Sequence, residues 1–386
     1  MPGLERGPPG GSPRSPDQDH DPARRILVAT PGFEGALMDE LRGPGTVPDA
    51  APADLTGGPW PGIVCVAEPT SGASPPLDPI FARQQLPAAF AARGSSVAAL
   101  AELAYQAAEA TVDASPGPFT IHAFSPTGGE LGLGSRVELI ASELLSRLRQ
   151  RRRRAARRYV PPAEAALAFD EIRVLVQLAL VARDRAFVSV AQPRALETGG
   201  WDLAPWPGGI APILDDRQPP SRAYRKLEEA FRWMAAEPRP GELCVDLGGA
   251  PGGWSYTALR RDARVIAVDR APLSAPVRNH PHLTMIEGNA FTYQPPPEHV
   301  PVDWLLSDVI CEPARALGQL DRWLRQGWCR RLVMTVKFKG SSGYGMLADV
   351  RQCLIAAGCP RWRIKHLHHN KNEVTIMAES LVARRE

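Results

Sequence analysis

Lysine is scarce in this chain of 386 residues. Of its 45 lysines and arginines only five are lysines, and all five follow residue 220. A coding bias explains arginine wherever positive charge alone is needed. A lysine kept in such a chain is a candidate for chemistry, because an amine loses its proton when desolvated or crowded by cations, whereas a guanidinium does not. These candidates are Lys226, Lys337, Lys339, Lys365 and Lys371.

Metal-binding and membrane-spanning patterns are also missing. The six cysteines form no CxxC pair, so we expect reduced, mostly buried thiols. The histidine cluster at 366–369 has no acidic or cysteine partner at a useful spacing, and we expect no metal site. No run of about 18 apolar residues occurs, and the start of the chain lacks a hydrophobic signal core. The sequence therefore predicts a cytoplasmic protein without membrane contact. It does not indicate the oligomeric state, and a monomer fits the pattern.

Composition shifts divide the chain into five segments. Residues 1–23 are rich in proline, glycine, serine and charge, and are expected to form a disordered leader. Residues 24–92 and 93–200 each mix strand and helix patterns and are expected to form two α+β modules. In the second module the pattern predicts a strand at 119–124, a long helix at 137–158 and a hairpin with its turn around Arg183. Residues 201–220 are expected to be a linker, and 221–386 a third domain.

The last of these segments predicts a different architecture. A helix over 221–234 places Tyr224, Leu227 and Phe231 on one face. Apolar strands then alternate with helical spacers, which is typical of a doubly wound α/β sheet. We expect those strands at 242–247, 264–269, 303–308, 331–338 and 373–379.

A glycine-rich loop at 246–254, Asp-Leu-Gly-Gly-Ala-Pro-Gly-Gly-Trp, follows the first of these strands and opens a helix. The glycines allow close approach of a ligand, and Asp269, 21 residues after Gly248, can bind the hydroxyls of a ribose. A dinucleotide site would show G-x-G-x-x-G, so the loop favours S-adenosylmethionine over a nicotinamide cofactor, which stays an alternative. The loop candidates are Gly248, Ala250, Pro251, Gly252, Gly253 and Trp254.

Four motifs resemble the FtsJ-type 2'-O-methyltransferases: the loop, LLSDVICEPA, TVKFKG and NEVTI. The resemblance implies a catalytic tetrad and a Rossmann-like methyltransferase fold. It places the tetrad at Lys226, Asp308, Lys337 and Glu373.

Further segments, including PGFEGALMDEL, PIFARQQL and LHHNKNEVTI, resemble the RlmM family of bacterial cytidine 2'-O-methyltransferases acting on large-subunit (23S) ribosomal RNA. This resemblance implies that the first module is ferredoxin-like and the second THUMP-like and RNA-binding. It also adds Asn289 and Asp308 to the cofactor-binding candidates, although Asn289 stands where an acid is frequent.

The chemistry assigns each tetrad member a role. A ribose hydroxyl is a weak acid, so its attack on a sulfonium methyl needs a general base. Lys337 is the candidate, in a neutral form favoured by the neighbouring cation Lys226 and by desolvation. Asp308 would orient it, and Glu373 and Lys226 would position the ribose. Lys339 is a competitor for the base role on spacing alone.

Eight arginines and no acidic residue occur between Arg147 and Arg158, a density that can neutralise RNA phosphates. A solvated helix end is the plainer interpretation of the same run. Two other functions remain open: an RNA-binding protein with an inactive methyltransferase domain, and methylation of another RNA such as tRNA. The RNA-binding candidates are Arg151, Arg152, Arg153, Arg154, Arg157 and Arg158.

Overall fold

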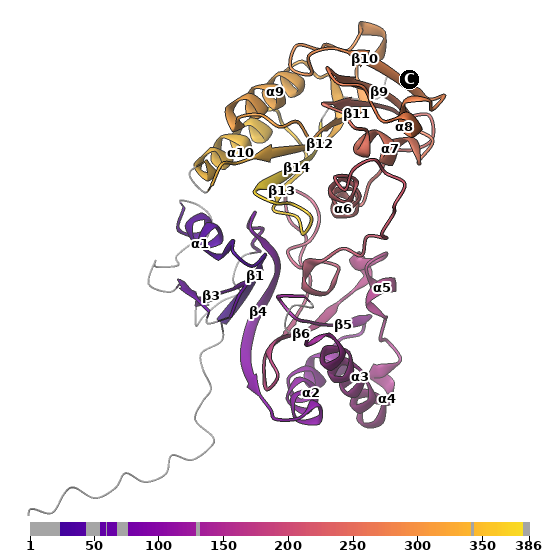
Figure 1. The fold of residues 1–386 in the computed structure, drawn as a ribbon. Coiled ribbons are helices and arrows are strands. Elements are labelled where there is room, and N and C mark those ends of the chain that lie inside the picture. Colours follow the sequence, from indigo (N-terminus) through magenta and orange to yellow (C-terminus); the bar gives the residue numbers. More distant parts are fainter. Residues whose placement is uncertain are drawn as a thin grey trace, which may run out of the picture.

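The computed structural model describes residues 24–43, 55–58, 60–67, 76–128, 132–340 and 343–380. The expected leader at 1–23 lies outside the described residues. Two seven-stranded sheets organise the rest of the chain, one in the N-terminal and one in the C-terminal half. The two halves stack on one another, and the C-terminal half carries the orange and yellow elements (Figure 1).

The N-terminal sheet has the strand order β2-β3-β1-β4-β7-β6-β5, and all of its neighbours are antiparallel except β5 and β6. The predicted strands at 119–124 and the predicted hairpin around Arg183 are confirmed. The strands are β1 (Arg24–Ala29), β2 (Leu55–Gly57), β3 (Ile63–Ala67), β4 (Ala82–Arg93), β5 (Phe119–Phe124), β6 (Val174–Ala182) and β7 (Arg185–Ala191).

Strand β4 joins the two predicted N-terminal modules into one sheet. Its first part pairs with β1 up to Ala89, and its last four residues pair with β7 from Phe90 onward. The sequence pattern did not indicate this strand, because three of its buried residues are polar: Arg83, Gln84 and Gln85. Their side chains are satisfied by backbone groups of other segments, so they are buried without an apolar pattern.

Helices cover the second part of this sheet. The predicted helix at 137–158 was wrong in its bounds, because the helix begins at Gly134 and is interrupted at Arg152, whose φ of −134° and ψ of 56° are not helical. Between Arg149 and Arg158 only Ala155 is buried, so little apolar surface holds a continuous helix there. The helices are α1 (Glu34–Arg42), α2 (Val97–Ala114), α3 (Gly134–Arg151), α4 (Arg153–Ala156) and α5 (Pro162–Ala165).

The C-terminal sheet confirms the doubly wound α/β prediction. Its order is β10-β9-β8-β11-β12-β14-β13; the first five are parallel, and β14 is antiparallel to both of its neighbours. Strands β10 and β13 were not predicted: β10 is only partly buried, and β13 carries three basic residues. The strands are β8 (Leu243–Leu247), β9 (Arg264–Asp269), β10 (Leu283–Glu287), β11 (Val302–Ser307), β12 (Cys329–Lys337), β13 (Arg361–Lys365) and β14 (Glu373–Glu379).

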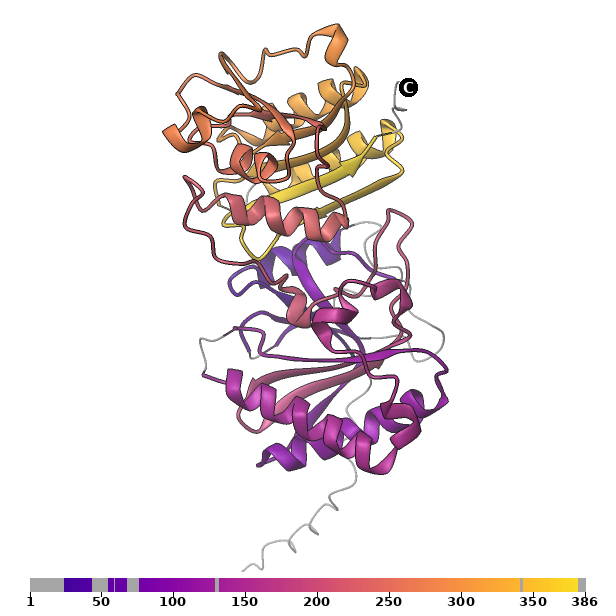
Figure 2. The ribbon, with the colours of Figure 1, turned by 90° about the vertical axis from the view of Figure 1, so that its right-hand side faces the viewer.

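Helices pack on both faces of this sheet (Figure 2). Apolar residues of α6 and α7 share one core with Val333 of β12, whereas α9 and α10 share the other with Leu332 and Met334. Because successive side chains of a strand point to opposite faces, Thr335 and Lys337 lie on the face that α6 covers. The helices are α6 (Tyr224–Met234), α7 (Gly253–Leu259), α8 (Ala275–Arg278), α9 (Pro313–Arg325) and α10 (Leu347–Ala356), and short 3-10 helices occur at Phe169–Glu171, Pro207–Gly209, Pro297–His299 and Tyr344–Met346.

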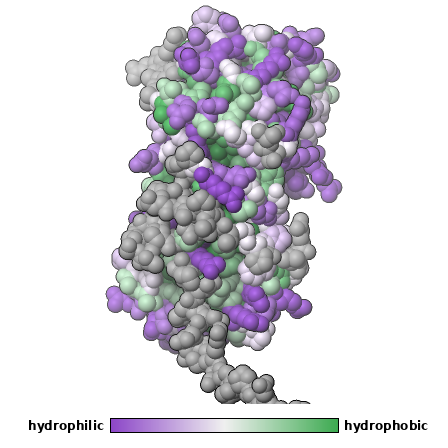
Figure 3. All heavy atoms as spheres, turned by 90° about the vertical axis from the view of Figure 1, so that its left-hand side faces the viewer, coloured by the Kyte–Doolittle hydropathy of each residue, from purple (hydrophilic) through white to green (hydrophobic). Residues whose placement is uncertain are grey.

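The two halves share an apolar core. Leu37 and Leu41 of α1 belong to the same buried cluster as Val374 and Ile376 of β14. Hydrophilic residues cover most of the outline of the C-terminal half in Figure 3, with hydrophobic residues in smaller patches between them. Among the described residues, no helix combines the length and the apolar character needed to span a bilayer.

Candidate active site

The tetrad predicted from the sequence comes together at the carboxyl edge of the parallel strands. Asp308 directly follows β11, and Lys337 is the last residue of β12. Strand β14 runs antiparallel to β12, so its first residue, Glu373, stands in register with Lys337. Lys226 reaches the same edge from the first turn of α6, which lies across this face of the sheet.

The four side chains form one network of ion pairs. The Nζ atom of Lys226 lies 2.9 Å from Asp308 Oδ2 and 2.9 Å from Glu373 Oε1. The Nζ atom of Lys337 donates to Asp308 Oδ1 and lies 3.4 Å from Glu373 Oε2. Each lysine therefore contacts both carboxylates.

Burial makes these charges interact strongly. The side chains of Lys226 and Asp308 are 13% and 16% exposed, and that of Glu373 is 5% exposed. Burial alone would lower the pKa of Lys226, but Asp308 and Glu373 outweigh it and raise that pKa. Burial would likewise raise the pKa of Asp308, but Lys337 and Lys226 overcome it and lower that pKa. Lys226 and Asp308 are therefore a fixed cation and a fixed anion of the site.

Lys339, the competitor for the base role, lies outside this network. Its side chain is 89% exposed, and its Nζ atom pairs with Glu312 Oε1 at 2.6 Å. Glu312 is itself 67% exposed. A strand that continued to residue 339 would place Lys339 on the same face as Lys337. Strand β12 ends at Lys337, so this alternation does not apply to Lys339.

Thr335 belongs to the site, although the sequence analysis missed it. Its Oγ1 atom donates to Asp308 Oδ1 at 2.7 Å and accepts from Lys337 Nζ at 3.0 Å. The backbone oxygen of Asp308 also accepts from Lys337 at 2.8 Å. The signal was the spacing in VMTVK, because residues two apart on a strand share a face.

The glycine-rich loop lies beside the tetrad. Gly248 has a φ of +74°, and a Cβ atom at this position would collide with the side chain of Val309, the neighbour of Asp308. A Cβ atom at Gly253, the first residue of α7, would collide with Ser221 Oγ. The loop thus packs closely against the 308–309 segment and the start of α6, and its positive φ makes a side chain at Gly248 strained as well as crowded.

Two further cofactor candidates end neighbouring strands and shape the loop. Asp269, at the end of β9, accepts from the backbone nitrogens of Ala250 at 3.0 Å and Ala271 at 2.9 Å. A carboxylate has about four acceptor positions, so two remain for ribose hydroxyls. Asn289, two residues beyond β10, uses Oδ1 to accept from Phe291 N at 3.0 Å.

Trp254 lies deeper than the sequence suggested. Its side chain is buried, and its Nε1 atom donates to the backbone oxygen of Ala223 at 2.9 Å. It packs in the core shared by α6 and α7. Its indole therefore fixes the helix that carries Lys226 against the helix that follows the loop.

Asp246, at the foot of the loop, is a second residue that the sequence analysis left out of the site. It is 1% exposed and accepts from Ser255 Oγ at 2.6 Å. Burial raises the pKa of its carboxyl group to about 7. A Cβ atom at Gly249 would come within 3.0 Å of this carboxylate, so the loop also closes over Asp246.

The predicted RNA-binding arginines divide into two groups. Arg151 pairs with Glu102 at 2.8 Å, and Arg152 pairs with Glu109 at 2.7 Å, both toward α2. Arg158 donates to the backbone oxygen of Val112 at 2.6 Å. The remaining three are exposed and make no ion pair with the described part of the chain: Arg153, Arg154 and Arg157.

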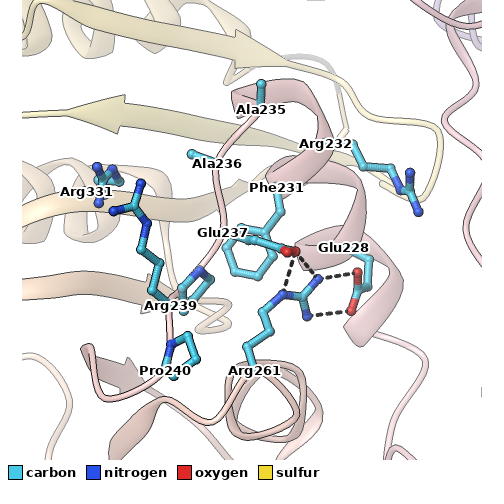
Figure 4. A pocket seen from close by; sticks show the side chains of 11 residues that line it. Glu228, Phe231, Arg232, Ala235, Ala236, Glu237, Arg239, Pro240, Arg261 and Arg331 are labelled. Carbon is cyan, nitrogen blue, oxygen red and sulfur yellow. Dashed lines mark hydrogen bonds and ion pairs between the residues drawn. The ribbon is translucent and has the colours of Figure 1, made fainter. Parts of the chain in front are cut away.

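A pocket of about 630 Å³ lies at the C-terminal end of α6 (Figure 4). It is lined by no residue of the glycine-rich loop or of the basic run at 147–158. Arg261 lies between Glu228 and Glu237 in its wall, at 2.9 Å and 2.7 Å. None of the four tetrad residues lines it. In the described segments, no group of three or more histidine, cysteine or acidic side chains could hold a metal ion.

Comparison with known proteins agrees with this geometry. Residues 219–326 match the model of the FtsJ-like methyltransferase family. The chain is 34% identical over 190 residues to "Ribosomal RNA large subunit methyltransferase M" of Xylella fastidiosa (strain M12), covering 46% of this chain and 52% of the relative. It is 33% identical over 237 residues to the protein of the same name from Laribacter hongkongensis, covering 57% of this chain and 64% of the relative.

These similarities confirm the family resemblance predicted from the sequence. The match spans between one half and two thirds of the length of these two relatives. Among solved structures, "a ribosomal RNA methyltransferase, putative, from Plasmodium falciparum" superposes with a TM-score of 0.33 at 16% identity, covering 42% of this chain and 99% of that one.

Proposed function

We propose that this protein transfers a methyl group from S-adenosylmethionine to a ribose 2'-hydroxyl of RNA, at a cytidine of large-subunit ribosomal RNA. The observation that carries the proposal is the buried network of Lys226, Asp308, Lys337 and Glu373 beside a glycine-rich loop. Relatives that are about one-third identical over part of the chain are named as large-subunit ribosomal RNA methyltransferases, which supports the choice of RNA.

The residues at the carboxyl edge fit the cofactor. The loop at 248–253 contains only glycine, alanine and proline, so no long side chain separates its backbone from a ligand. Asp269 would bind the ribose of the cofactor, the backbone from Ala250 to Gly253 would line its adenosine and methionine parts, and Asn289 would lie near the base. When bound, S-adenosylmethionine supplies a methyl group activated on a positively charged sulfur.

The tetrad supplies the acid-base chemistry of the transfer. The amine of Lys337, acting as a neutral base, would take the proton of the 2'-hydroxyl whose oxygen receives the methyl group. Lys226, whose pKa is raised by Asp308 and Glu373, stays charged and shares both carboxylates with Lys337. Asp308 and Thr335 orient the amine of Lys337, since both contact its Nζ atom.

The N-terminal half would bind the RNA. We propose that the module at 24–92 is ferredoxin-like and that the module at 93–200 is THUMP-like, although they share a continuous sheet. Arg153, Arg154 and Arg157 would contact phosphates, because they are exposed and form no ion pair with the residues that the structure describes. Arg151, Arg152 and Arg158 would hold α3 and α4 in place, since their guanidinium groups bond within the module.

Methyl transfer from labelled cofactor tests the proposal directly. The full chain is incubated with labelled S-adenosylmethionine and ribosomal RNA from cells that lack the gene, and the label is mapped to a nucleotide. We expect one 2'-O-methylated cytidine in the large-subunit RNA. Label on tRNA alone would change the substrate, and no label on any RNA would favour an RNA-binding protein with an inactive domain.

The nicotinamide alternative is separated by thermal stability. A ligand that binds only the folded state raises the melting temperature in proportion to the logarithm of its concentration over its dissociation constant. We expect S-adenosylhomocysteine to raise the melting temperature and NAD to leave it unchanged. The reverse result would move the chain to the oxidoreductases.

A further inference from the structure

Helix α6 carries a buried carboxylate that the methyl-transfer steps above do not use. Glu229 follows Lys226 by three residues and is 1% exposed. Its neighbour Glu228 instead lines the pocket of Figure 4. An isolated buried carboxylate is costly, so its hydrogen-bond partners show why it is kept.

The partners of Glu229 are two backbone amides of one turn. Its Oε1 atom accepts from His368 N at 2.9 Å, and its Oε2 atom accepts from His369 N at 3.0 Å. Both amides belong to the turn at 366–372 between β13 and β14, and the next residue is Glu373. A single carboxylate on α6 therefore fixes the peptide segment that delivers the last member of the tetrad.

We propose that Glu229 is a positioning residue of the methyl transfer, which holds the 366–372 turn so that Glu373 meets Lys226 and Lys337. This role rests on the proposed function. Its geometric basis is that α6 carries both Lys226 and the group that anchors the turn, so the distance from Lys226 to Glu373 is set through one rigid helix. A group that is misplaced by about 1 Å can cost about 100-fold in rate.

The N-terminal half contributes to the same anchor. Arg83 of β4 is buried, and its Nη1 atom lies 3.4 Å from His368 Nδ1. Its Nη2 atom donates to the backbone oxygens of Ala29 at 3.1 Å and Pro126 at 2.9 Å. The turn is thus held from α6 on one side and from the proposed RNA-binding half on the other.

Charge at this anchor depends on pH. Burial raises the pKa of Glu229 to about 7, against the opposing effect of the two backbone hydrogen bonds and Arg83. Burial lowers the pKa of His369 to about 4 and also lowers that of His368, so both rings are neutral where Glu229 titrates. Arg83 stays charged, because its pKa is lowered only to about 10. Below pH 7 the carboxyl group gains a proton and loses acceptor capacity toward one of the two amides.

The variant Glu229→Gln tests the role, with Glu228→Gln as the control on the same helix. A glutamine has one acceptor oxygen, so it can hold only one of the two amides. We expect hydrogen exchange of at least one of the His368 and His369 amides to rise at least tenfold in the first variant, and that of both amides to stay unchanged in the control. We expect kcat to fall about 10- to 100-fold, while KM for S-adenosylmethionine stays within about twofold.

The pH profile supplies a readout that a purely structural role would not change. As the pH drops through 7, the methyl-transfer rate of the wild type should fall by a larger factor than the rate of Glu229→Gln, because only the wild type has a carboxylate to lose at this position. Glu229→Asp is the second variant, in case the glutamine variant melts early; its shorter side chain should give an intermediate loss of kcat with the pH limb retained.

The outcomes separate the two proposals. Unchanged exchange at the two amides, or a kcat for Glu229→Gln equal to that of the control, would overturn the positioning role while the methyl-transfer activity of the wild type stands. Absence of transfer by the wild-type chain would instead refute the proposed function, and this role with it. Loosened exchange together with a selective loss of kcat supports both.

Discussion

At the scale of single residues, the site depends on two lysines with different surroundings. Lys226 is bound between two carboxylates at 2.9 Å each and is the fixed charge. Lys337 contacts the same carboxylates, and its Nζ atom also donates to Thr335 Oγ1 and to the backbone oxygen of Asp308. The proposed base is therefore the lysine whose nitrogen direction is fixed by neutral oxygens as well as by charge.

Replacement of Lys337 by alanine should abolish the base. We expect Lys337→Ala to lower the methyl-transfer rate by about 100- to 10,000-fold, the contribution typical of a general base. Binding of S-adenosylhomocysteine, measured by calorimetry, should change little because the glycine loop remains. Lys339→Ala is the matched control, since that side chain is 89% exposed, and it should keep most of the activity. A large loss in the control and a small one in Lys337→Ala would assign the base to Lys339.

A second prediction concerns Asp246 and stability. The pKa of its carboxyl group is raised to about 7 in the folded chain, from an ordinary value of 3.8. The unfolded chain therefore ionises first, and the stability that this group contributes below pH 3.8 is lost as the pH rises toward 7. Asp246→Asn should remove that loss.

The free energy of unfolding of Asp246→Asn, relative to wild type, should therefore rise between pH 5 and pH 7, by up to about 1.4 kcal/mol for each pH unit. Urea denaturation at several pH values measures it. Glu229 titrates in both proteins, so the difference between them isolates Asp246. Parallel curves for the two proteins would show that the carboxyl group is already ionised in the folded chain.

At the scale of elements, the interruption of the helix at Arg152 separates two kinds of arginine. Arg151 and Arg152 face α2 and pair with Glu102 and Glu109. Short helix α4 then turns Arg153 and Arg154 to solvent. One basic run thus provides both the contacts that pack the module and the charges available to a polyanion.

The exposed group should dominate the salt dependence of RNA binding. Replacing Arg153, Arg154 and Arg157 by alanine should weaken RNA binding and lower the slope of log affinity against log salt by about two, if each contacts one phosphate. Filter binding over a series of salt concentrations measures the slope. The control, Arg151→Ala, should leave the slope nearly unchanged because that arginine is engaged with Glu102. An unchanged slope in the triple variant would favour the solvated helix end.

At the scale of the whole molecule, buried charges join the two halves. Asp78 accepts from Arg363 at 2.6 Å and from Lys365 at 2.6 Å, both in β13. Lys365 is 4% exposed and also donates to the backbone oxygens of Pro79 and Ala82. Because β13 leads into the turn before Glu373, the N-terminal half helps to hold the catalytic edge.

Removal of this anchor should destabilise the chain. Asp78→Ala leaves buried cations without their carboxylate, which costs about 3 kcal/mol or more in comparable cases. The midpoint of urea unfolding should fall accordingly. Asp39→Ala, which breaks a largely exposed pair with Arg42, should change the free energy of unfolding by less than about 0.5 kcal/mol. Equal effects of the two substitutions would show that the interface contributes nothing beyond surface pairing.

The sequence by itself determined the α/β architecture of the C-terminal half, and the family resemblance nominated the four residues that the proposed mechanism uses. Alternation of apolar strands and helices specifies a parallel sheet, and such a sheet places the ends of β8, β9 and β11 at one edge. The glycine-rich loop could also be found from the sequence. Glycines between a strand and a helix let a ligand approach the backbone closely, and this order of elements is visible along the chain. These are local patterns, and local patterns persist in the folded chain.

The tertiary structure alone decided which of the nominated residues come together in the buried network and which lie elsewhere. The exposed fraction of Lys339, the burial of Trp254 and the intramolecular pairs of Arg151 and Arg152 follow from segments far away in the sequence. So do the polar strand β4 and the anchor made by Glu229, whose partners lie about 140 residues further along the chain. A buried polar residue is explained only by its partner, and a one-dimensional pattern does not contain that partner.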